Sequence, residues 1–177
     1  MLDLSKHIKV SKSLEDENKN LSTHGKSLHP ISPELIKPAE LWRVKLVAKA
    51  RDGVKASWSE NISGYSSKWV RQVAEHTYGY TDYGLFNYFG STAIETGRKL
   101  RSLSLVLPGT TQLLPGDILL QEEGSAGDGH IAIYLGGNQV AENSLRNKGP
   151  DGRGITTLEL FGKITGVARL DDITNKK

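Results

Sequence analysis

The sequence predicts an α+β domain in which helices come first and a short antiparallel sheet follows. Apolar residues recur at helical spacing over about 39–51 and 66–78, which predicts two amphipathic helices. Apolar runs of strand length begin only after about residue 117, and glycine-rich turns separate them. Helices followed by a series of strands are typical of the α+β class.

The N-terminal segment, residues 1–38, is polar and has no steady periodicity, and proline recurs near its end. Because proline favours extended conformations in the residue before it, we expect an extended or disordered arm. Such an arm is either a loose leader or a segment that docks onto a partner. It lacks the continuous apolar stretch of a secretory signal, so none is expected there. The expected domain spans 39–172, and 173–177 form a tail.

The first helix is expected over 39–51, where Asp52-Gly53 ends the helical pattern. A loop rich in serine, glycine and asparagine follows over 56–65 and contains Trp58. The composition of this loop predicts irregular structure between two helices.

The second helix is expected over 66–78, where apolar residues form one stripe and Gly79 ends the pattern. Residues 80–98 are rich in aromatic residues and glycine, and a short helix is expected near 91–97. The strands are then expected at about 117–121, 130–135, 139–143 and 164–170.

Composition excludes several classes of function. The net charge is only +3 and the pI is near 9.0, and acidic and basic residues interleave, so a nucleic-acid partner is not expected. This mild charge is compatible with an anionic surface such as a cell wall. No apolar run approaches the roughly 18 residues of a membrane span. The absence of cysteine excludes disulfides and cysteine-ligated zinc, and we expect no metal or other cofactor.

The turn Gly136-Gly137-Asn138 predicts a hairpin between two strands, and this hairpin has a chemical consequence. It brings Glu142 or Asn143 next to His130, which begins the first of the two strands. A carboxylate or amide there can hold the imidazole N–H and fix the tautomer and orientation of the ring. A histidine at a strand entrance can equally be an edge residue that only satisfies its own hydrogen bonds.

A nucleophile would complete such a site, and the start of the helix at 66–78 is the natural place for it. The unpaired N–H groups and the dipole of a helix N-terminus favour an anionic nucleophile and an oxyanion. Ser66 and Ser67 lie there. Helix capping is the commonest role of serine at this position and is the alternative.

Four blocks of sequence resemble one family. They are Ser66–Val70 (SSKWV), Pro115-Gly116-Asp117, Gly129–Gly136 (GHIAIYLG) and Glu142, twelve positions after the histidine. Over about 40–170 the chain resembles the papain-like cell-wall hydrolases of the NlpC-type peptidase family and the related CHAP amidases.

The resemblance implies a papain-like fold and cleavage of an amide bond in the peptide of bacterial peptidoglycan. It implies that Ser66 occupies the position of the nucleophile, that His130 is the general base and that Glu142 orients the base. Asn143 is the alternative orienting residue.

The chain also departs from the family pattern. Ser66 stands where the family has cysteine, Tyr65 where an acid is frequent, and Lys68 where glycine is frequent. Of the family's Tyr-x-Trp-Gly-Gly loop only Trp58 is retained, so the peptide specificity of the family is not implied. The expected substrate contacts are Trp58, Tyr65, Ser67 and Asp128.

A serine in a cysteine site leaves three explanations open. It is an engineered change made to disarm the enzyme or to trap substrate, a natural loss of catalysis that leaves a binding or structural module, or the nucleophile of a working serine hydrolase. Two functions are therefore open. The first is a peptidoglycan hydrolase, which would be a phage lysin, a virion-associated hydrolase or a bacterial effector. The second is a non-catalytic structural or wall-binding protein. In the second case the arm would anchor the domain in a virion or effector assembly.

Overall fold

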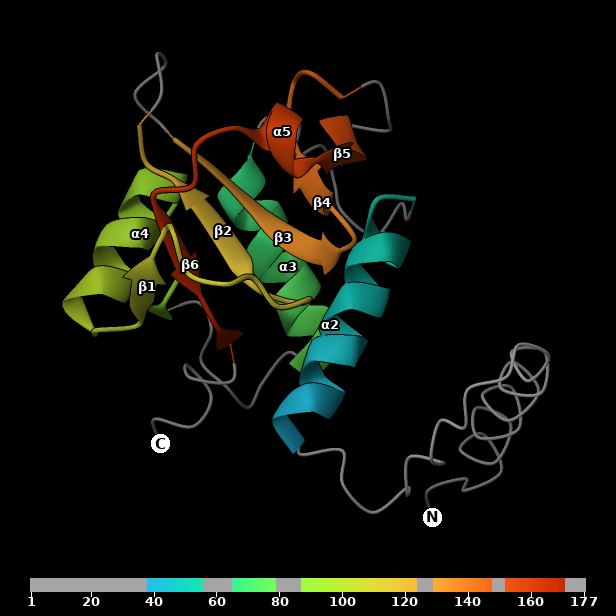
Figure 1. The fold of residues 1–177 in the computed structure, drawn as a ribbon, viewed down its shortest axis with the longest axis horizontal. Coiled ribbons are helices and arrows are strands. Elements are labelled where there is room, and N and C mark those ends of the chain that lie inside the picture. Colours follow the sequence, from blue (N-terminus) through green and yellow to red (C-terminus); the bar gives the residue numbers. More distant parts are fainter. Residues whose placement is uncertain (1–37, 56–64, 79–86, 124–128, 148–151, 171–177) are drawn as a thin grey trace, which may run out of the picture. The chain divides into compact units, whose positions relative to one another are not determined.

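The computed structural model describes residues 38–55, 65–78, 87–123, 129–147 and 152–170 (Figure 1). Nearly all of the expected arm, the expected tail, the loop with Trp58 and the residue Asp128 lie outside the described residues. The arm and tail therefore remain predictions.

The described elements confirm the α+β class. Among the described residues, three helices precede all six strands of the sheet, and a short fourth helix lies between the last two strands in the sequence. The helices are α2 (Pro38–Gly53), α3 (Ser66–Tyr78), α4 (Ala93–Ser102) and α5 (Leu158–Phe161). The strands are β1 (Val106–Pro108), β2 (Ile118–Gln121), β3 (His130–Gly136), β4 (Gln139–Asn143), β5 (Arg153–Thr157) and β6 (Gly166–Ala168).

The predicted helix at 66–78 coincides with α3, and the predicted strand at 139–143 coincides with β4. The short helix expected near 91–97 was placed wrongly at both ends, since α4 spans Ala93–Ser102. Its start is fixed by Thr92, whose side chain accepts the N–H of Glu95 as an N-cap. The strand expected at 164–170 is only the three residues of β6.

The six strands form one antiparallel sheet in the order β1-β6-β2-β3-β4-β5. The predicted hairpin at Gly136–Asn138 is confirmed, because β3 and β4 pair on either side of it. All three turn residues have positive φ (87°, 55° and 65°), a conformation that glycine and asparagine adopt at low cost.

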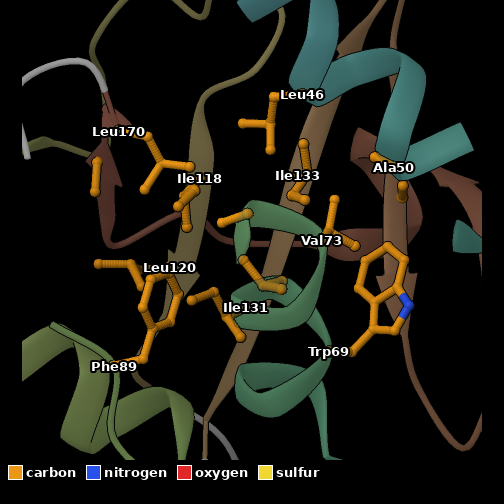
Figure 2. Packing of buried hydrophobic residues seen from close by; sticks show 14 of the residues in the cluster. Leu46, Ala50, Trp69, Val73, Phe89, Ile118, Leu120, Ile131, Ile133 and Leu170 are labelled. Carbon is orange, nitrogen blue, oxygen red and sulfur yellow. The ribbon is translucent and has the colours of Figure 1, made fainter. Parts of the chain in front are cut away.

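The sheet buries apolar side chains on both faces. On one face, Ile131 and Ile133 of β3 pack with Trp69 and Val73 of α3 and with Leu46 of α2 (Figure 2). The other face carries a smaller cluster, which α5 covers through Phe161; its strand members are Leu119, Ala132, Val140 and Val167. None of the helices in the described ranges has the length and apolar character that a bilayer crossing requires.

A buried carboxylate ties α2 to the sheet. Asp117 is fully buried, and its Oδ1 accepts hydrogen bonds from Arg43 of α2 at 2.9 Å and from Arg169 at 3.1 Å. Its Oδ2 accepts the backbone N–H of Leu114 at 2.9 Å. The Pro-Gly-Asp block of the sequence therefore has a structural role, because Asp117 joins a helix, a turn and the segment after β6.

Candidate active site

The candidate site lies where α3 and β3 begin. Figure 2 shows Trp69 and Ile131 toward one end of the helix–strand contact and Val73 and Ile133 toward the other. The helix and the strand therefore run in the same direction. Their first residues, Ser66 and His130, consequently lie at the same end of the domain.

The centre of the site is a hydrogen bond between His130 and Glu142. His130 Nε2 lies 2.6 Å from Glu142 Oε2. A carboxylate can only accept, so the N–H of the neutral ring lies on Nε2 and donates to Glu142. The ring then presents Nδ1 with its lone pair as the proton acceptor. The side chain of Glu142 is 3% exposed and that of His130 is 14% exposed, so water has little access to this bond.

Strand register explains why Glu142 and not Asn143 reaches the histidine. Ala132 is paired with Glu142, and side chains alternate between the two faces of a strand. Glu142 therefore lies on the same face as Ala132 and His130, and Asn143 on the face that α3 covers. Asn143 is fully buried there. The two alternatives left open by the sequence thus resolve in favour of Glu142 as the residue in contact with His130.

Two residues that the sequence did not suggest support this pair. The ring of Phe161 lies 5.5 Å from the ring of His130, tilted by 35°. Asn147 Nδ2 donates to Glu142 Oε1 at 3.3 Å, so both carboxylate oxygens are bonded. Phe161 is itself positioned by Gln121, whose side chain donates to its carbonyl at 3.2 Å. The histidine ring is therefore bonded to Glu142 through Nε2 and lies next to the ring of Phe161.

The two serines at the start of α3 have different surroundings. The hydroxyl of Ser67 donates to the carbonyl of Gly90 at 2.9 Å, lies 2.7 Å from Thr96 Oγ1, and is only 1% exposed. This burial gives Ser67 a structural role joining α3 to α4, with no surface for the substrate contact that was expected of it. Ser66 is 6% exposed, and within the described residues no hydrogen bond joins it to His130. Its direct contact with the histidine remains a prediction.

The electrostatics at the start of α3 favour an anion. The first intrahelical bond runs from the N–H of Trp69 to the carbonyl of Tyr65 at 3.0 Å, so the N–H groups of the first turn have no intrahelical acceptor. The first turn contains no acidic residue, and Lys68 adds a positive charge. A thiolate or an oxyanion at position 66 would be stabilised there. Tyr65 is 60% exposed beside it, as a substrate contact would require.

Among the residues that the structure describes, no set of three histidine, aspartate or glutamate side chains gathers closely enough to hold an ion. The two remaining expected substrate contacts, Trp58 and Asp128, lie outside those residues.

Gly129 sets the position of His130 and gives a testable effect on stability. Its φ is +66°, and an added Cβ would lie 2.6 Å from the carbonyl oxygen of Gln121. Because an L-residue in this conformation costs about 1–2 kcal/mol and the contact adds steric strain, we expect Gly129→Ala to lower the free energy of unfolding by more than about 2 kcal/mol. Chemical denaturation measures this difference.

Gly137→Ala is the matched control, since Gly137 also has positive φ (55°) but an added Cβ meets nothing within 4 Å. It should show only the conformational cost of about 1 kcal/mol. Equal losses in the two variants would contradict a steric role for the contact at Gly129.

Comparison with known proteins gives matches at the level of structure only. No family model matches the sequence, and no curated protein does. The structure is similar to the NlpC/p60 domain of the peptidoglycan hydrolase SagA, with 19% identity, coverage of 71% of this chain and 97% of that chain, and a TM-score of 0.44. It is also similar to the peptidoglycan hydrolase RipB from Mycobacterium tuberculosis, with 16% identity, coverage of 95% and 86%, and a TM-score of 0.48. Identities this low concern the fold, and the chemistry has to come from this chain's own side chains.

Proposed function

We propose that this domain is built to hydrolyse an amide bond in the peptide of bacterial peptidoglycan, with residue 66 as the nucleophile position. The observation that carries the proposal is the shielded His130–Glu142 pair at the end of the sheet where α3 begins. Nucleophilic acyl transfer requires an oriented imidazole within reach of a nucleophile at a helix N-terminus. His130 and the start of α3 lie at the same end of the domain, and contact between His130 and residue 66 is part of the proposal. The choice of peptidoglycan comes from the sequence resemblance.

The proposed reaction has two stages, and His130 acts first as a base and then as an acid in each of them. Nδ1 of His130 accepts the proton of the nucleophile at position 66, which attacks the carbonyl carbon of the amide. The negative charge on the carbonyl oxygen is stabilised by N–H groups of the first turn of α3. His130 then gives its proton to the leaving nitrogen as the C–N bond breaks. Water, deprotonated by His130, attacks the acyl intermediate. His130 returns this proton to the side chain at position 66 as the bond to the acyl carbon breaks, and the acid product leaves. Glu142 stabilises the imidazolium that forms twice in this cycle.

The alternative function is a non-catalytic wall-binding or structural domain with the same fold. One observation favours it: residue 66 is serine, and within the described residues its hydroxyl has no hydrogen bond to the proposed base. A serine hydroxyl needs the full help of a base, whereas a thiol beside histidine ionises readily.

The experiment that tests the proposal compares the unmodified protein and Ser66→Cys on purified cell walls. Loss of turbidity reports lysis, and mass analysis of the released fragments identifies the bond that was cut. New amine and carboxyl termini within the peptide support an amide hydrolase. Fragments cut between sugars would contradict it.

Glu142→Gln measures the contribution of the orienting carboxylate. In the Ser66→Cys background we expect the hydrolysis rate to fall about tenfold or more, and by less than in His130→Ala. The amide can still accept the hydrogen bond of the ring, but it stabilises the imidazolium less. Initial rates of turbidity loss measure the effect.

Glu159→Gln makes the same charge change at an exposed position of α5 and should leave the rate unchanged. A Glu142→Gln variant as fast as its parent would contradict the orienting role of Glu142.

A further inference from the structure

A second feature of the site is a cavity of about 340 Å³ at the start of α3. Its wall includes Tyr65, which directly precedes the nucleophile position, and Lys68, the third residue of α3. The opposite wall comes from α4 and the segment before it, including Phe89 and Lys99. Neither Ser66 nor His130 lines this cavity, and Tyr65 links it to the nucleophile position.

Positive charge dominates the wall of this cavity. Lys68, Arg71 and Lys99 face a single acid, Glu95. The N–H and the hydroxyl of Ser91 donate to Glu95 at 2.8 and 2.6 Å, and these hydrogen bonds lower the pKa of its carboxyl group. The carboxylate of Glu95 is thus already engaged, and the cavity keeps a cationic excess.

The two lysines retain donors for a ligand. The ammonium group of Lys99 donates one of its three N–H groups to the carbonyl of Phe89 at 3.0 Å. Within the part of the chain that the structure describes, Lys68 makes no hydrogen bond or ion pair. The charge of Arg71, in contrast, is partly offset by Glu75 at 3.5 Å.

We propose that this cavity binds a carboxylate group of the peptide substrate, held by Lys68 and Lys99. The inference rests on the proposed function, because it assigns the specificity of the same site. The rings of Phe89 and Tyr65 beside the two ammonium groups suit the aliphatic part of an amino acid that carries the carboxylate. Recognition of the carboxylate is thereby assigned to Tyr65, Lys68, Phe89 and Lys99, in place of the family loop that this chain does not retain.

The test is binding of a purified soluble muropeptide, in its free-acid form and with its carboxyl groups converted to amides. Titration calorimetry on the unmodified chain measures both, without any need for turnover. We expect amidation to weaken binding about tenfold, since a charge-assisted hydrogen bond contributes about that factor. Lys68→Gln and Lys99→Gln should each weaken binding of the acid about three- to tenfold and reduce the difference between acid and amide.

Lys49→Gln is the matched control. It removes the same charge from a different cavity, which Thr77 near the far end of α3 also lines. It should leave both affinities unchanged. Equal binding of acid and amide, binding of neither, or an equal effect of Lys49→Gln would overturn the carboxylate site.

The two proposals fail in different ways. If Ser66→Cys hydrolyses walls while acid and amide forms bind alike, the reaction stands and the carboxylate site is wrong. If the lysine variants discriminate as expected while Ser66→Cys hydrolyses nothing, the cavity binds carboxylates and the proposed reaction is wrong.

Discussion

Ser66→Cys is expected to raise the rate of peptidoglycan hydrolysis at least about a hundredfold over the unmodified chain. A thiol beside an oriented imidazole at a helix N-terminus is substantially ionised at neutral pH, whereas a serine hydroxyl is not. A site shaped for sulfur would also hold the smaller serine oxygen too far from the carbonyl, and a displacement of about 1 Å can cost a hundredfold. Turbidity loss of purified walls measures the rate.

The structure supplies a control for this gain in the neighbouring serine. Ser67 begins the same helix, but its hydroxyl is buried against Gly90 and Thr96. Ser67→Cys should therefore create no activity. Adding His130→Ala to Ser66→Cys should remove the gain by at least about a hundredfold, because the general base is lost.

Other outcomes would decide between the open explanations. Strong lysis by the unmodified protein, abolished in Ser66→Ala, would identify a working serine hydrolase. No lysis by a folded Ser66→Cys protein on several wall types would favour the non-catalytic alternative. Activity that survives His130→Ala would show that the histidine is not the base.

The parts of the fold that local sequence signals specify were predicted correctly. The apolar stripe and the glycine after it located α3, and the Gly-Gly-Asn turn located the β3–β4 hairpin. The hairpin in turn placed His130 and Glu142 together, because strand pairing converts a spacing of twelve residues into a contact. This half of the candidate site was accessible from sequence.

The rest depends on contacts that have no local signature. β1 and β5 are the two edge strands of the sheet, and their pairing with β6 and β4 defines them. Phe161 reaches His130 only because the four-residue helix α5 folds over the sheet. Asn147 reaches Glu142 from the turn after β4. No periodicity indicates such contacts, and β1, β5 and α5 were therefore missed.

The second large effect concerns stability and is expected from Asp117→Ala. Its carboxylate is fully buried and accepts hydrogen bonds from Arg43, Arg169 and the N–H of Leu114. Removing one partner of a buried ionic network leaves the other charges without compensation, which costs about 3–5 kcal/mol. For a domain of this size that corresponds to a fall in Tm of roughly 10 °C, measurable by calorimetry.

A surface ion pair provides the control for this loss. Lys163 and Glu123 are 2.6 Å apart, but their side chains are 72% and 69% exposed, so Glu123→Gln should change stability by less than about 1 kcal/mol. Asp117→Asn should fall between the two, since the amide keeps an acceptor oxygen but loses the charge that the two arginines compensate. If Asp117→Ala were no more destabilising than Glu123→Gln, the buried network would not hold α2 to the sheet. The Pro-Gly-Asp block would then need another role. A role in the candidate site does not fit its position, because the carbonyl of Asp117 accepts the N–H of Tyr134, toward the end of β3 opposite His130.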